Sequence, residues 1–508
     1  VMSHSSPLLK YLEDSSSGDR VLDTGLIAYL ASLEQISHVS PEVAKSIVAE
    51  LSDQQSSLKM IASENYSSLA VQLAQGNLFT DKYAEGYPFH RFYAGCDNVD
   101  TVENFAAELA CSLFGADHAY VQPHSGADAN MVAYWAILSA RVQVPFMENV
   151  GKVDIGSLTD SEWASLRISL GNQRLLGMDY YSGGHLTHGY RHNVSSRMFQ
   201  AESYSVSRET NLIDYDEIRD HVKKFKPLIL LAGYSAYPRG INFRIFKEIA
   251  DEVGAVFMVD MAHFSGLVAG KAFDGDYDPI SYADVVTSTT HKTLRGPRGG
   301  MVLCTQEFAE YVDKGCPLVL GGPLPHAMAA KAVAFEEASR DDFQKYAACV
   351  IDNASVLAQS CMDEGFKVVT GGTDNHLILL DVTPFGLTGR QAESAAREAS
   401  ITLNRNTLPF DDNGPWYTSG LRLGTPALTT LGMTNKEMSE IADIVKLVLS
   451  TIEPVTINRG DNVGKISKAR YKLEEDVLKE ARIRTSDLLS HFAVYPELDI
   501  EYLKEMFG

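Results

Sequence analysis

The stretch Ala255-Val256-Phe257-Met258-Val259-Asp260-Met261-Ala262-His263 decides the fold, together with Asp284-Val285-Val286-Thr287-Ser288-Thr289-Thr290-His291-Lys292 further along the chain. Each stretch begins as a short apolar run and ends in polar residues. An apolar run of this length without alternation is typical of a strand that is buried on both faces of a sheet. An acid closes the first strand and a lysine follows the second, so both have a chargeable side chain at the carboxyl end.

Helices alternate with strands on both sides of this pair. We predict helices over residues 99–114, 127–138, 215–225 and 243–253, and strands over residues 119–121, 228–232, 255–259, 284–287 and 300–303. This alternation indicates an α/β fold with a mostly parallel sheet that helices cover. Ligands of such a sheet gather at the carboxyl ends of its strands, where the acid and the lysine are expected.

The chain is long enough for more than one domain, because its 508 residues exceed the usual size of one apolar core. We predict an N-terminal arm of two amphipathic helices over residues 1–65, a large α/β domain over residues 66–345 and a smaller C-terminal α+β domain over residues 346–508. A long helical region over residues 326–364 leads to strands over 367–369 and 376–382 and helices over 389–399 and 435–452. Residues 141–172 lack strong periodicity and are predicted to be a surface insertion.

Composition argues against several classes of protein. The net charge of −22 opposes nonspecific binding to nucleic acid, and no apolar run is long enough to span a bilayer. The six cysteines form no C-x-x-C pair, which favours scattered thiols in a reducing compartment. Residues 1–20 are rich in serine and lack the apolar stretch of a secretory signal, so we expect a cytoplasmic location.

A lysine just past a strand end can act as an amine nucleophile when it is desolvated. Lys292 has that position, among small hydroxyl residues and glycines, although a single lysine is more often a solvated surface cation. Asp260 strengthens the nucleophile hypothesis because a carboxylate at the end of a buried strand requires a cationic partner. A protonated pyridine nitrogen would supply that partner. A simple cap of the next turn is the alternative for Asp260.

Two further segments have the composition of ligand-binding turns. His124-Ser125-Gly126-Ala127-Asp128-Ala129-Asn130 is a turn of small residues that enters a helix, and its free N–H groups suit a phosphate, with an ordinary N-cap as the alternative. Gly183-Gly184-His185-Leu186-Thr187-His188-Gly189 has glycines that permit the close approach of a flat ligand. His185 and His188 lack an adjacent acidic ligand, so we expect no metal site.

Several short blocks, in this order, make the chain similar to the serine hydroxymethyltransferase family from about Leu58 to Leu449. The blocks are Ile61-Ala62-Ser63-Glu64-Asn65, Lys82-Tyr83-Ala84-Glu85-Gly86-Tyr87-Pro88, the turn at Ser125, Gly183-Gly184-His185, Val259-Asp260-Met261-Ala262-His263, Thr289-Thr290-His291-Lys292, Gly371-Gly372-Thr373-Asp374-Asn375-His376 and Thr418-Ser419-Gly420-Leu421-Arg422. The resemblance implies the aminotransferase-like fold, fold type I, of pyridoxal-phosphate enzymes. It also implies reversible transfer of the hydroxymethyl carbon of serine to tetrahydrofolate, which gives glycine and 5,10-methylenetetrahydrofolate.

The resemblance implies a pyridoxal 5′-phosphate site in which Lys292 holds the cofactor as a Schiff base, Asp260 pairs with the ring nitrogen and His185 stacks on the ring. The other implied cofactor-binding residues are Ser125, Gly126 and Ala127 for the phosphate, Ser235 and His263 near the ring hydroxyl, and Tyr83, which would reach into a neighbouring subunit's site. A shared site makes a homodimer the smallest expected assembly, and a tetramer stays open.

The resemblance also implies residues that act on serine, glycine and folate. Arg422 would clamp the carboxylate of the amino acid, because a planar guanidinium binds two oxygens at once, with an internal salt bridge as the alternative. Glu85 would bind substrate and move protons as the Cα–Cβ bond of serine breaks. The remaining catalytic candidates are Tyr93, His291 and Thr289, and the remaining substrate-binding candidates are Ser63, Tyr93, Tyr180, Gly184, Leu186, Asn406, Gly414, Pro415 and Trp416.

Several positions depart from the family pattern. Phe92 stands where a tyrosine is usual, so an aromatic face for folate is kept but its hydroxyl is lost. Phe89-His90 replaces Gly-Lys, and Ser182 replaces a histidine. Pro317-Leu318-Val319 stands in place of a Pro-Gly-Gly loop that would bring backbone amides to a neighbouring subunit's phosphate. Folate affinity and cofactor affinity are the properties that these changes affect.

Two alternative functions follow. A folate-independent aldolase or alanine racemase would keep the cofactor, but Asn404, Asn406 and Asn413-Gly414-Pro415-Trp416 resemble the family's folate-side wall. A non-catalytic scaffold or RNA-binding protein would need none of the chemistry, and the presence of Lys292 and Glu85 together argues against it. We therefore expect small molecules and a second copy of the chain as partners, without nucleic acid or membrane.

Overall fold

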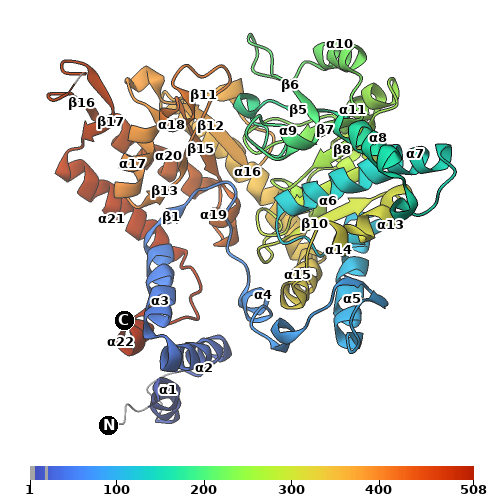
Figure 1. Ribbon diagram of the computed structural model, residues 1–508. Coiled ribbons are helices and arrows are strands. Elements are labelled where there is room, and N and C mark those ends of the chain that lie inside the picture. The colour runs from blue at the N-terminus through green and yellow to red at the C-terminus, as the bar shows by residue number, and fades with distance from the viewer. Residues whose placement is uncertain (1–5, 18–20, 461) are drawn as a thin grey trace.

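A seven-stranded sheet forms the middle of the right-hand lobe of the molecule in Figure 1. The computed structural model describes residues 6–17, 21–460 and 462–508, so residues 1–5 and 18–20 of the serine-rich start lie outside the described residues. The strand order across the sheet is β4-β10-β9-β8-β7-β5-β6. These strands are β4 (His118–Tyr120), β10 (Gly300–Cys304), β9 (Val285–Thr289), β8 (Val256–Asp260), β7 (Ile229–Gly233), β5 (Arg174–Met178) and β6 (Gln200–Tyr204).

The sheet is mostly parallel, which confirms the predicted fold class. β6, β5, β7, β8 and β9 run parallel to one another, whereas β10 is antiparallel to β9 and β4. All residues of β7, β8, β9 and β10 are buried, as their continuous apolar runs predict. The edge strand β6 was not predicted, because most of its residues are polar and exposed and it has no apolar run.

Alternate residues of the strands face two apolar cores, one on each side of the sheet. In β8, Phe257 and Val259 belong to one core and Val256 and Met258 to the other. The helices of the first core include α5 (Asp97–Phe114), α10 (Tyr215–Phe225), α11 (Phe243–Asp251), α15 (Pro325–Ala338) and the start of α16 (Asp341–Asp363), and those of the second include α6 (Gly126–Leu138) and α13 (Gln306–Asp313). A shift of one residue in the pairing register of a strand would turn every side chain of that strand to the opposite core. The packing of the two cores therefore fixes the register, and with it the place where each strand ends.

A second sheet is antiparallel and has its own apolar core. Its strands, in order, are β11 (Lys367–Val368), β12 (Leu377–Asp381), β15 (Gly420–Gly424) and β14 (Asn404–Asn406). The helices of this core are α16 (Asp341–Asp363), α17 (Gly389–Glu398), α20 (Asn435–Leu449) and α21 (Glu475–His491). We propose that the two sheets belong to two domains that meet near residue 345.

Two predicted segments differ from the structure. The helical region over residues 326–364 is divided into α15 and α16 by Ser339 and Arg340. Residues 141–172 are largely helical, with a π-helical turn over Ser139–Gln143 followed by α7 (Val144–Asn149) and α8 (Asp160–Gly171). Periodicity missed α8 because Leu166 is its one fully buried residue.

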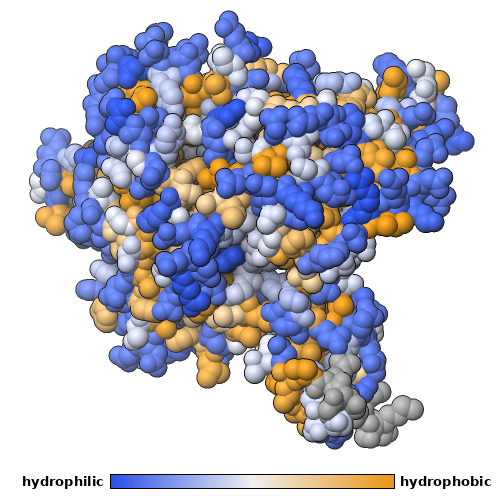
Figure 2. All heavy atoms as spheres, turned by 180° about the vertical axis from the view of Figure 1, so that it is seen from behind, coloured by the Kyte–Doolittle hydropathy of each residue, from blue (hydrophilic) through white to orange (hydrophobic). Residues whose placement is uncertain are grey.

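The two ends of the described chain fold together. α1 (Pro7–Ser16), α2 (Thr24–Val39) and α3 (Pro41–Ser56) share an apolar cluster with α22 (Ile500–Phe507). Lys10 Nζ and Glu505 Oε1 lie 2.6 Å apart across this cluster. It projects from the body of the molecule in Figure 1, and Figure 2 shows apolar side chains on its surface. The arm therefore has three helices rather than the predicted two, and α22 packs on the arm.

The remaining elements are short. They are β1 (Leu58–Lys59), which pairs with β13 (Ile401–Thr402), the hairpin of β2 (Gly86–Tyr87) and β3 (His90–Arg91), the hairpin of β16 (Glu453–Thr456) and β17 (Ile466–Lys472), α4 (Leu69–Leu73), α9 (Ser195–Met198), α12 (Ser265–Ala269), α14 (Gly315–Leu318), α18 (Gly414–Tyr417) and α19 (Pro426–Thr430). In the part of the chain that the structure describes, no helix combines the length and the apolarity needed to cross a membrane.

Candidate active site

The carboxyl ends of β8 and β9 bring the predicted acid and lysine to the same edge of the sheet. Asp260 is the last residue of β8 and pairs in register with Thr287 of β9. Thr289, the last residue of β9, donates from Oγ1 to Ala262 O at 3.2 Å, and Thr293 Oγ1 donates to His263 O at 2.9 Å. These bonds hold the loop that contains Lys292 against the segment that follows Asp260.

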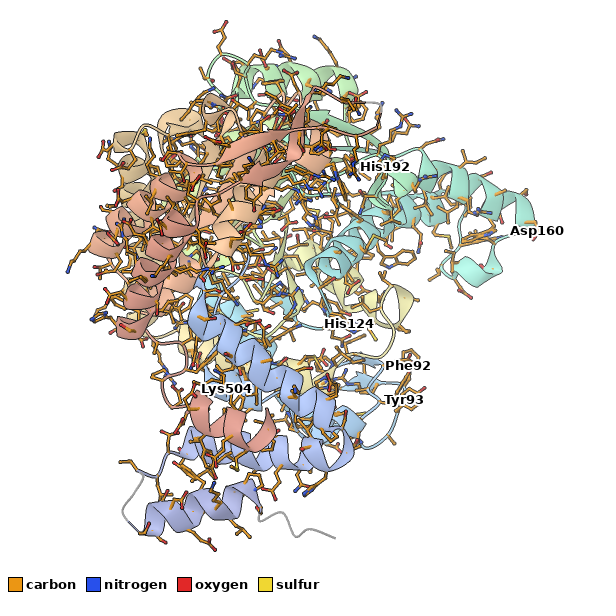
Figure 3. All side chains as sticks on the ribbon, turned by 90° about the vertical axis from the view of Figure 1, so that its left-hand side faces the viewer. Phe92, Tyr93, His124, Asp160, His192 and Lys504 are labelled. Carbon is orange, nitrogen blue, oxygen red and sulfur yellow. The ribbon has the colours of Figure 1, made fainter. Side chains whose placement is uncertain are left out.

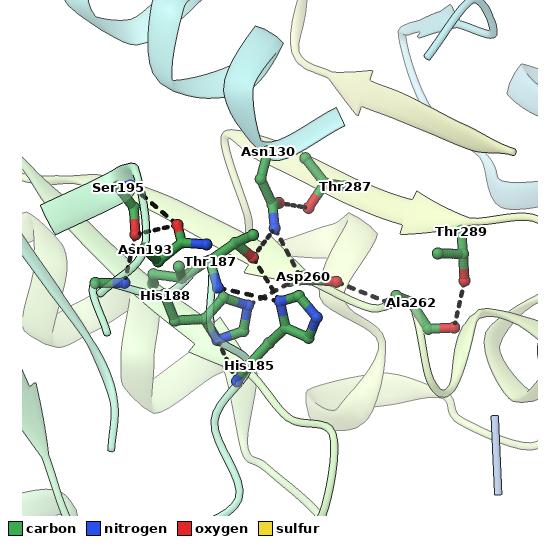
Figure 4. A network of polar contacts seen from close by, with 12 residues as sticks. Asn130, His185, Thr187, His188, Asn193, Ser195, Asp260, Ala262, Thr287 and Thr289 are labelled. Atoms are coloured by element: carbon green, nitrogen blue, oxygen red, sulfur yellow. Dashed lines mark hydrogen bonds and ion pairs between the residues drawn. The ribbon is translucent and has the colours of Figure 1, made fainter. Parts of the chain in front are cut away.

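Asp260 is the centre of a buried hydrogen-bond network (Figure 4). Its Oδ2 lies 2.9 Å from His188 Nε2 and accepts a bond from Asn130 Nδ2 at 3.0 Å, and its Oδ1 accepts from Ala262 N at 3.0 Å. Asn130 is itself oriented by Thr287, whose Oγ1 donates to Asn130 Oδ1 at 2.6 Å. The carboxylate is therefore fixed by groups from α6, from the segment after β8 and from the segment after β5.

This network keeps Asp260 ionised. Burial by itself raises the pKa of Asp260, but the hydrogen bond and the charge of His188, the nearby His185 and the bond from Asn130 together hold the pKa well below its usual range. The pKa of His185 is lowered to about 4, mainly by burial and then by His188. The site therefore presents a fixed anion at Asp260 next to an uncharged imidazole at His185.

Lys292 is partly buried, and no hydrogen bond of its amine is found within the described residues. Burial lowers its pKa to about 8, with Arg422 and Arg298 acting in the same direction and Asp260 opposing them. The backbone of the loop is held from the opposite side, where Asn65 Nδ2 donates to Lys292 O at 3.0 Å. The amine of Lys292 therefore becomes neutral at a lower pH than that of an ordinary lysine, and the neutral form is the one that can act as a nucleophile.

The turn before α6 has the features of an anion-binding cradle. Ser125 caps the helix, with its Oγ accepting from Asp128 N at 3.1 Å. The N–H groups of Gly126 and Ala127 have no acceptor within the described residues and lie at the positive end of the helix. A Cβ atom on Gly126 would lie 2.8 Å from Thr289 Cγ2, so a larger residue would crowd the loop toward Lys292. These features suit a phosphate group.

A pocket of about 420 Å³ lies between the two sheets at Arg422. Arg422 Nη1 donates to Ser235 O at 2.6 Å and its Nε donates to Asn404 Oδ1 at 3.1 Å. No ion pair to a carboxylate is found for it in the described chain, which argues against the internal salt bridge. Predicted substrate residues that line this pocket are Tyr180, Gly184, Leu186, Asn406 and Pro415.

The other predicted residues near this pocket are placed as follows. His185 and Ser235 line it together with Arg422. Gly414 and Trp416 are in α18 next to it, with Trp416 exposed. Ser63 follows Ala62, whose backbone approaches Gly424 at the end of β15.

Tyr83, Glu85 and Tyr93 lie on a different surface, around the β2–β3 hairpin. Tyr83 Oη donates to Glu85 Oε1 at 3.2 Å, and the rings of Tyr83 and Tyr93 are 4.9 Å apart. Figure 3 shows Phe92 and Tyr93 at the periphery of the molecule. Within the described residues of this one chain, no hydrogen bond or ring contact joins these side chains to Lys292, Asp260 or Arg422.

Some residues of the site lie in segments that the sequence singled out, but it predicted no role for them in binding the cofactor. His188, Asn130 and Thr187 belong to the Asp260 network, and His376 Nε2 lies 3.1 Å from His263 Nδ1. Burial followed by the charge of Lys292 holds the pKa of His263 well below its usual range, so the imidazole is neutral. His291 is also neutral, because burial lowers its pKa to about 3, and its Nδ1 accepts from Gly299 N at 3.4 Å.

Comparison with known proteins gives consistent results. The family model described as serine hydroxymethyltransferase matches residues 36–170 and 165–445. A serine hydroxymethyltransferase of Treponema pallidum is 57% identical over 99% of this chain and 87% of its own length. One of Salinispora tropica is 58% identical over 93% of this chain and 98% of its own, and one of Chlamydia felis is 51% identical over 98% and 99%.

Proposed function

The chain belongs to the serine hydroxymethyltransferase family, and from that premise we propose which of its residues perform each part of the reaction. It is a pyridoxal-phosphate enzyme that reversibly transfers the hydroxymethyl carbon of serine to tetrahydrofolate, giving glycine and 5,10-methylenetetrahydrofolate. The relatives give no support to a folate-independent aldolase or racemase as the main activity.

The residues at the strand ends fit the cofactor. One observation carries the assignment: the buried, ionised Asp260 lies at the same edge of the sheet as Lys292. The two side chains are close enough for the charge of Asp260 to raise the pKa of the Lys292 amine, against the effect of burial. A pyridine ring that carries a proton matches the acid, an aldehyde matches the amine, and a phosphate matches the free N–H groups of Gly126 and Ala127. We assign the binding of the phosphate to Ser125, Gly126 and Ala127.

Pyridoxal phosphate supplies an electron sink for the bond that breaks. In this proposal Asp260 holds a proton on the ring nitrogen, and His188 and Asn130 keep that carboxylate ionised and oriented. His185 offers the flat face of a neutral imidazole for stacking, and His263, Ser235, Thr289 and His291 line the surroundings of the ring and of Lys292.

Arg422 is our candidate for the carboxylate of serine or glycine. Burial lowers its pKa to about 10, with Tyr180 opposing, so the guanidinium stays charged at physiological pH. Its Nη1 and Nε bonds go to uncharged oxygens, which orient the guanidinium without neutralising it. The pocket wall formed by Tyr180, Leu186 and Asn406 would then receive the folate.

We further propose that Glu85, Tyr83 and Tyr93 complete the site of a second copy of the chain, which makes a homodimer the smallest active assembly. Their separation from Lys292 within one chain and the exposure of Tyr83 and Tyr93, 56% and 47%, support this proposal. Two ion pairs of Arg91, to Asp100 at 2.8 Å and to Glu103 at 2.5 Å, hold the hairpin in place on α5.

We also propose a cytoplasmic location. The six cysteines of the described chain are free thiols, which supports a reducing compartment.

Absorbance titration tests the proposed function. The reconstituted protein should show a visible band that shifts when glycine is added and shifts again when tetrahydrofolate follows. Serine turnover should depend on tetrahydrofolate. Turnover that is equally fast without tetrahydrofolate would instead identify a folate-independent enzyme.

Reconstitution with the cofactor should become faster as the pH rises toward about 8, because only the neutral amine of Lys292 attacks an aldehyde and its pKa is lowered to about 8. The rate at which the visible band grows after mixing apoprotein with pyridoxal phosphate measures this from about pH 6 to about pH 9. Binding of 4-deoxypyridoxine phosphate, which has no aldehyde, is the control for general effects of pH. A rate that falls over this range would contradict the assignment of Lys292.

Phe92→Tyr should lower the KM for tetrahydrofolate by about two- to tenfold, since it adds a phenolic hydroxyl where folate is expected to stack. The KM for serine should not change. Phe89→Tyr is the matched control, because Phe89 and Phe92 are similarly exposed, 71% and 70%, on the same hairpin. Equal effects of both substitutions would show that Phe92 does not face the folate.

A further inference from the structure

Lys331 of α15 is a buried cation without a paired carboxylate. Only 1% of the surface of Lys331 is exposed. Its Nζ donates three hydrogen bonds to backbone carbonyls, to Val121 O at 2.6 Å, Pro123 O at 3.0 Å and Gly300 O at 2.9 Å. Among the described residues no acid lies within ion-pair distance of it. A buried ammonium with only neutral acceptors is costly unless a further negative charge lies near it.

The three carbonyls belong to the two backbone segments that enclose the cofactor's phosphate turn. Val121 and Pro123 lead directly into Ser125, and Pro123 O also accepts from Gly300 N at 2.9 Å. A Cβ atom on Gly300 would lie 2.2 Å from Ser125 O, so these two segments are in close contact. The Lys331 ammonium therefore bonds to both segments and holds the turn next to the start of β10.

The same ammonium lies against the loop that contains Lys292. A Cβ atom on Gly299 would lie 2.5 Å from Lys331 Cε and 3.2 Å from Thr290 Oγ1. Thr290 N donates to Gly299 O at 3.0 Å, which connects this contact to the residues before Lys292. A residue larger than glycine at position 299 would displace the ammonium.

We infer that Lys331 is a positioning residue whose buried positive charge is the counter-charge of the cofactor's phosphate. The inference rests on the proposed function, which places a phosphate on the Ser125 turn. Burial lowers the pKa of Lys331 to about 7 although Glu103 and Asp128 oppose that change, so the protein's own acids do not neutralise this cation. A phosphate dianion at the turn supplies the missing negative charge and keeps Lys331 protonated.

Comparison of pyridoxal 5′-phosphate with pyridoxal, which lacks the phosphate, separates an effect on phosphate binding from a general effect on the site, and the proton-uptake measurement described below separates the charge of Lys331 from its support of the turn. Lys331→Met should weaken binding of pyridoxal phosphate to the apoprotein on the order of tenfold to a hundredfold, and should change binding of pyridoxal by less than about threefold. Equilibrium dialysis followed by absorbance measures both constants. Lys345→Met, at an exposed lysine of α16, is the matched control and should change neither.

The outcomes are distinct. Equal weakening of both ligands in Lys331→Met would show that Lys331 only supports the backbone, and no weakening of either would show that it is not a counter-charge. Either result overturns the inference. If wild-type protein binds neither ligand, the proposed function itself fails.

A measurement on wild-type protein keeps the inference testable if Lys331→Met does not fold. Near pH 7.5, above the lowered pKa of about 7, binding of pyridoxal phosphate should take up more protons than binding of pyridoxal, because the phosphate restores the proton of Lys331. The titratable groups that face Lys331 are Glu103 of α5, Asp128 of α6 and His291 of the Lys292 loop. Calorimetry in buffers of different ionisation enthalpy measures the uptake, and equal uptake for the two ligands would overturn the inference.

Discussion

Lys292→Ala should abolish the borohydride-reducible adduct between the protein and pyridoxal phosphate and lower serine turnover by about 10³-fold or more. The reason is that, among residues 6–17, 21–460 and 462–508, no other amine is suited to replace it. Lys331, the other lysine with a strongly lowered pKa, has all three of its protons directed to backbone carbonyls. Mass spectrometry of the reduced, digested protein identifies the modified residue, and tetrahydrofolate-dependent release of glycine measures the turnover.

Lys345→Ala is the control for this experiment, because Lys345 is exposed on α16 and should leave both the adduct and the turnover as they are. The Lys292→Ala protein should still bind pyridoxal phosphate noncovalently, since Asp260 and the Ser125 turn do not depend on the amine. A stoichiometric reduced adduct on a different lysine of the variant would disprove the assignment of Lys292.

Glu85→Gln should retain the cofactor and lose hydroxymethyl transfer by about 10²- to 10⁴-fold, the usual contribution of a general acid–base group. The amide keeps the size of the side chain and can still accept from Tyr83 Oη, but it cannot exchange a proton. The visible band of the holoprotein should therefore be unchanged while transfer from serine to tetrahydrofolate nearly stops. Asp81→Asn, at an exposed acid just before the hairpin, should have no such effect.

Mixing the two inactive variants tests whether Glu85 acts across subunits. A hybrid dimer of Lys292→Ala and Glu85→Gln chains contains one site with both native residues only if the hairpin of one chain enters the site of the other. Hybrids purified through two different affinity tags should regain a large part of the activity of one native site. Hybrids as inactive as their parents would place Glu85 in the site of its own chain.

Local sequence signals predicted the parts of the site that depend on a single element. The apolar runs of β8 and β9 placed Asp260 and Lys292 at strand ends, and small residues before α6 indicated the Ser125 cap. The partners of Asp260 could not be found in the same way. His188 and Asn130 are 72 and 130 positions away from it along the chain, and only the folded sheet brings them together.

Local sequence signals also could not predict two residues near the site, Lys331 and Glu85. Lys331 is in a helix whose other residues are mostly small and apolar, so nothing nearby in the sequence distinguishes it from a surface lysine. In our proposal, Glu85 reaches Lys292 only in a second copy of the chain, and the pattern of one chain does not encode that arrangement. Family resemblance, rather than periodicity, was the basis for predicting Glu85.

The helix cluster formed by α1, α2, α3 and α22 imposes an order on folding during synthesis. Leu30 and Val48 leave the ribosome long before Tyr502 and Phe507, which cover the same cluster. At roughly 5–20 residues per second, the first helices wait for tens of seconds before that cover arrives. We expect the nascent chain to expose the apolar side chains of α1, α2 and α3 during this interval, so chaperones have reason to bind there.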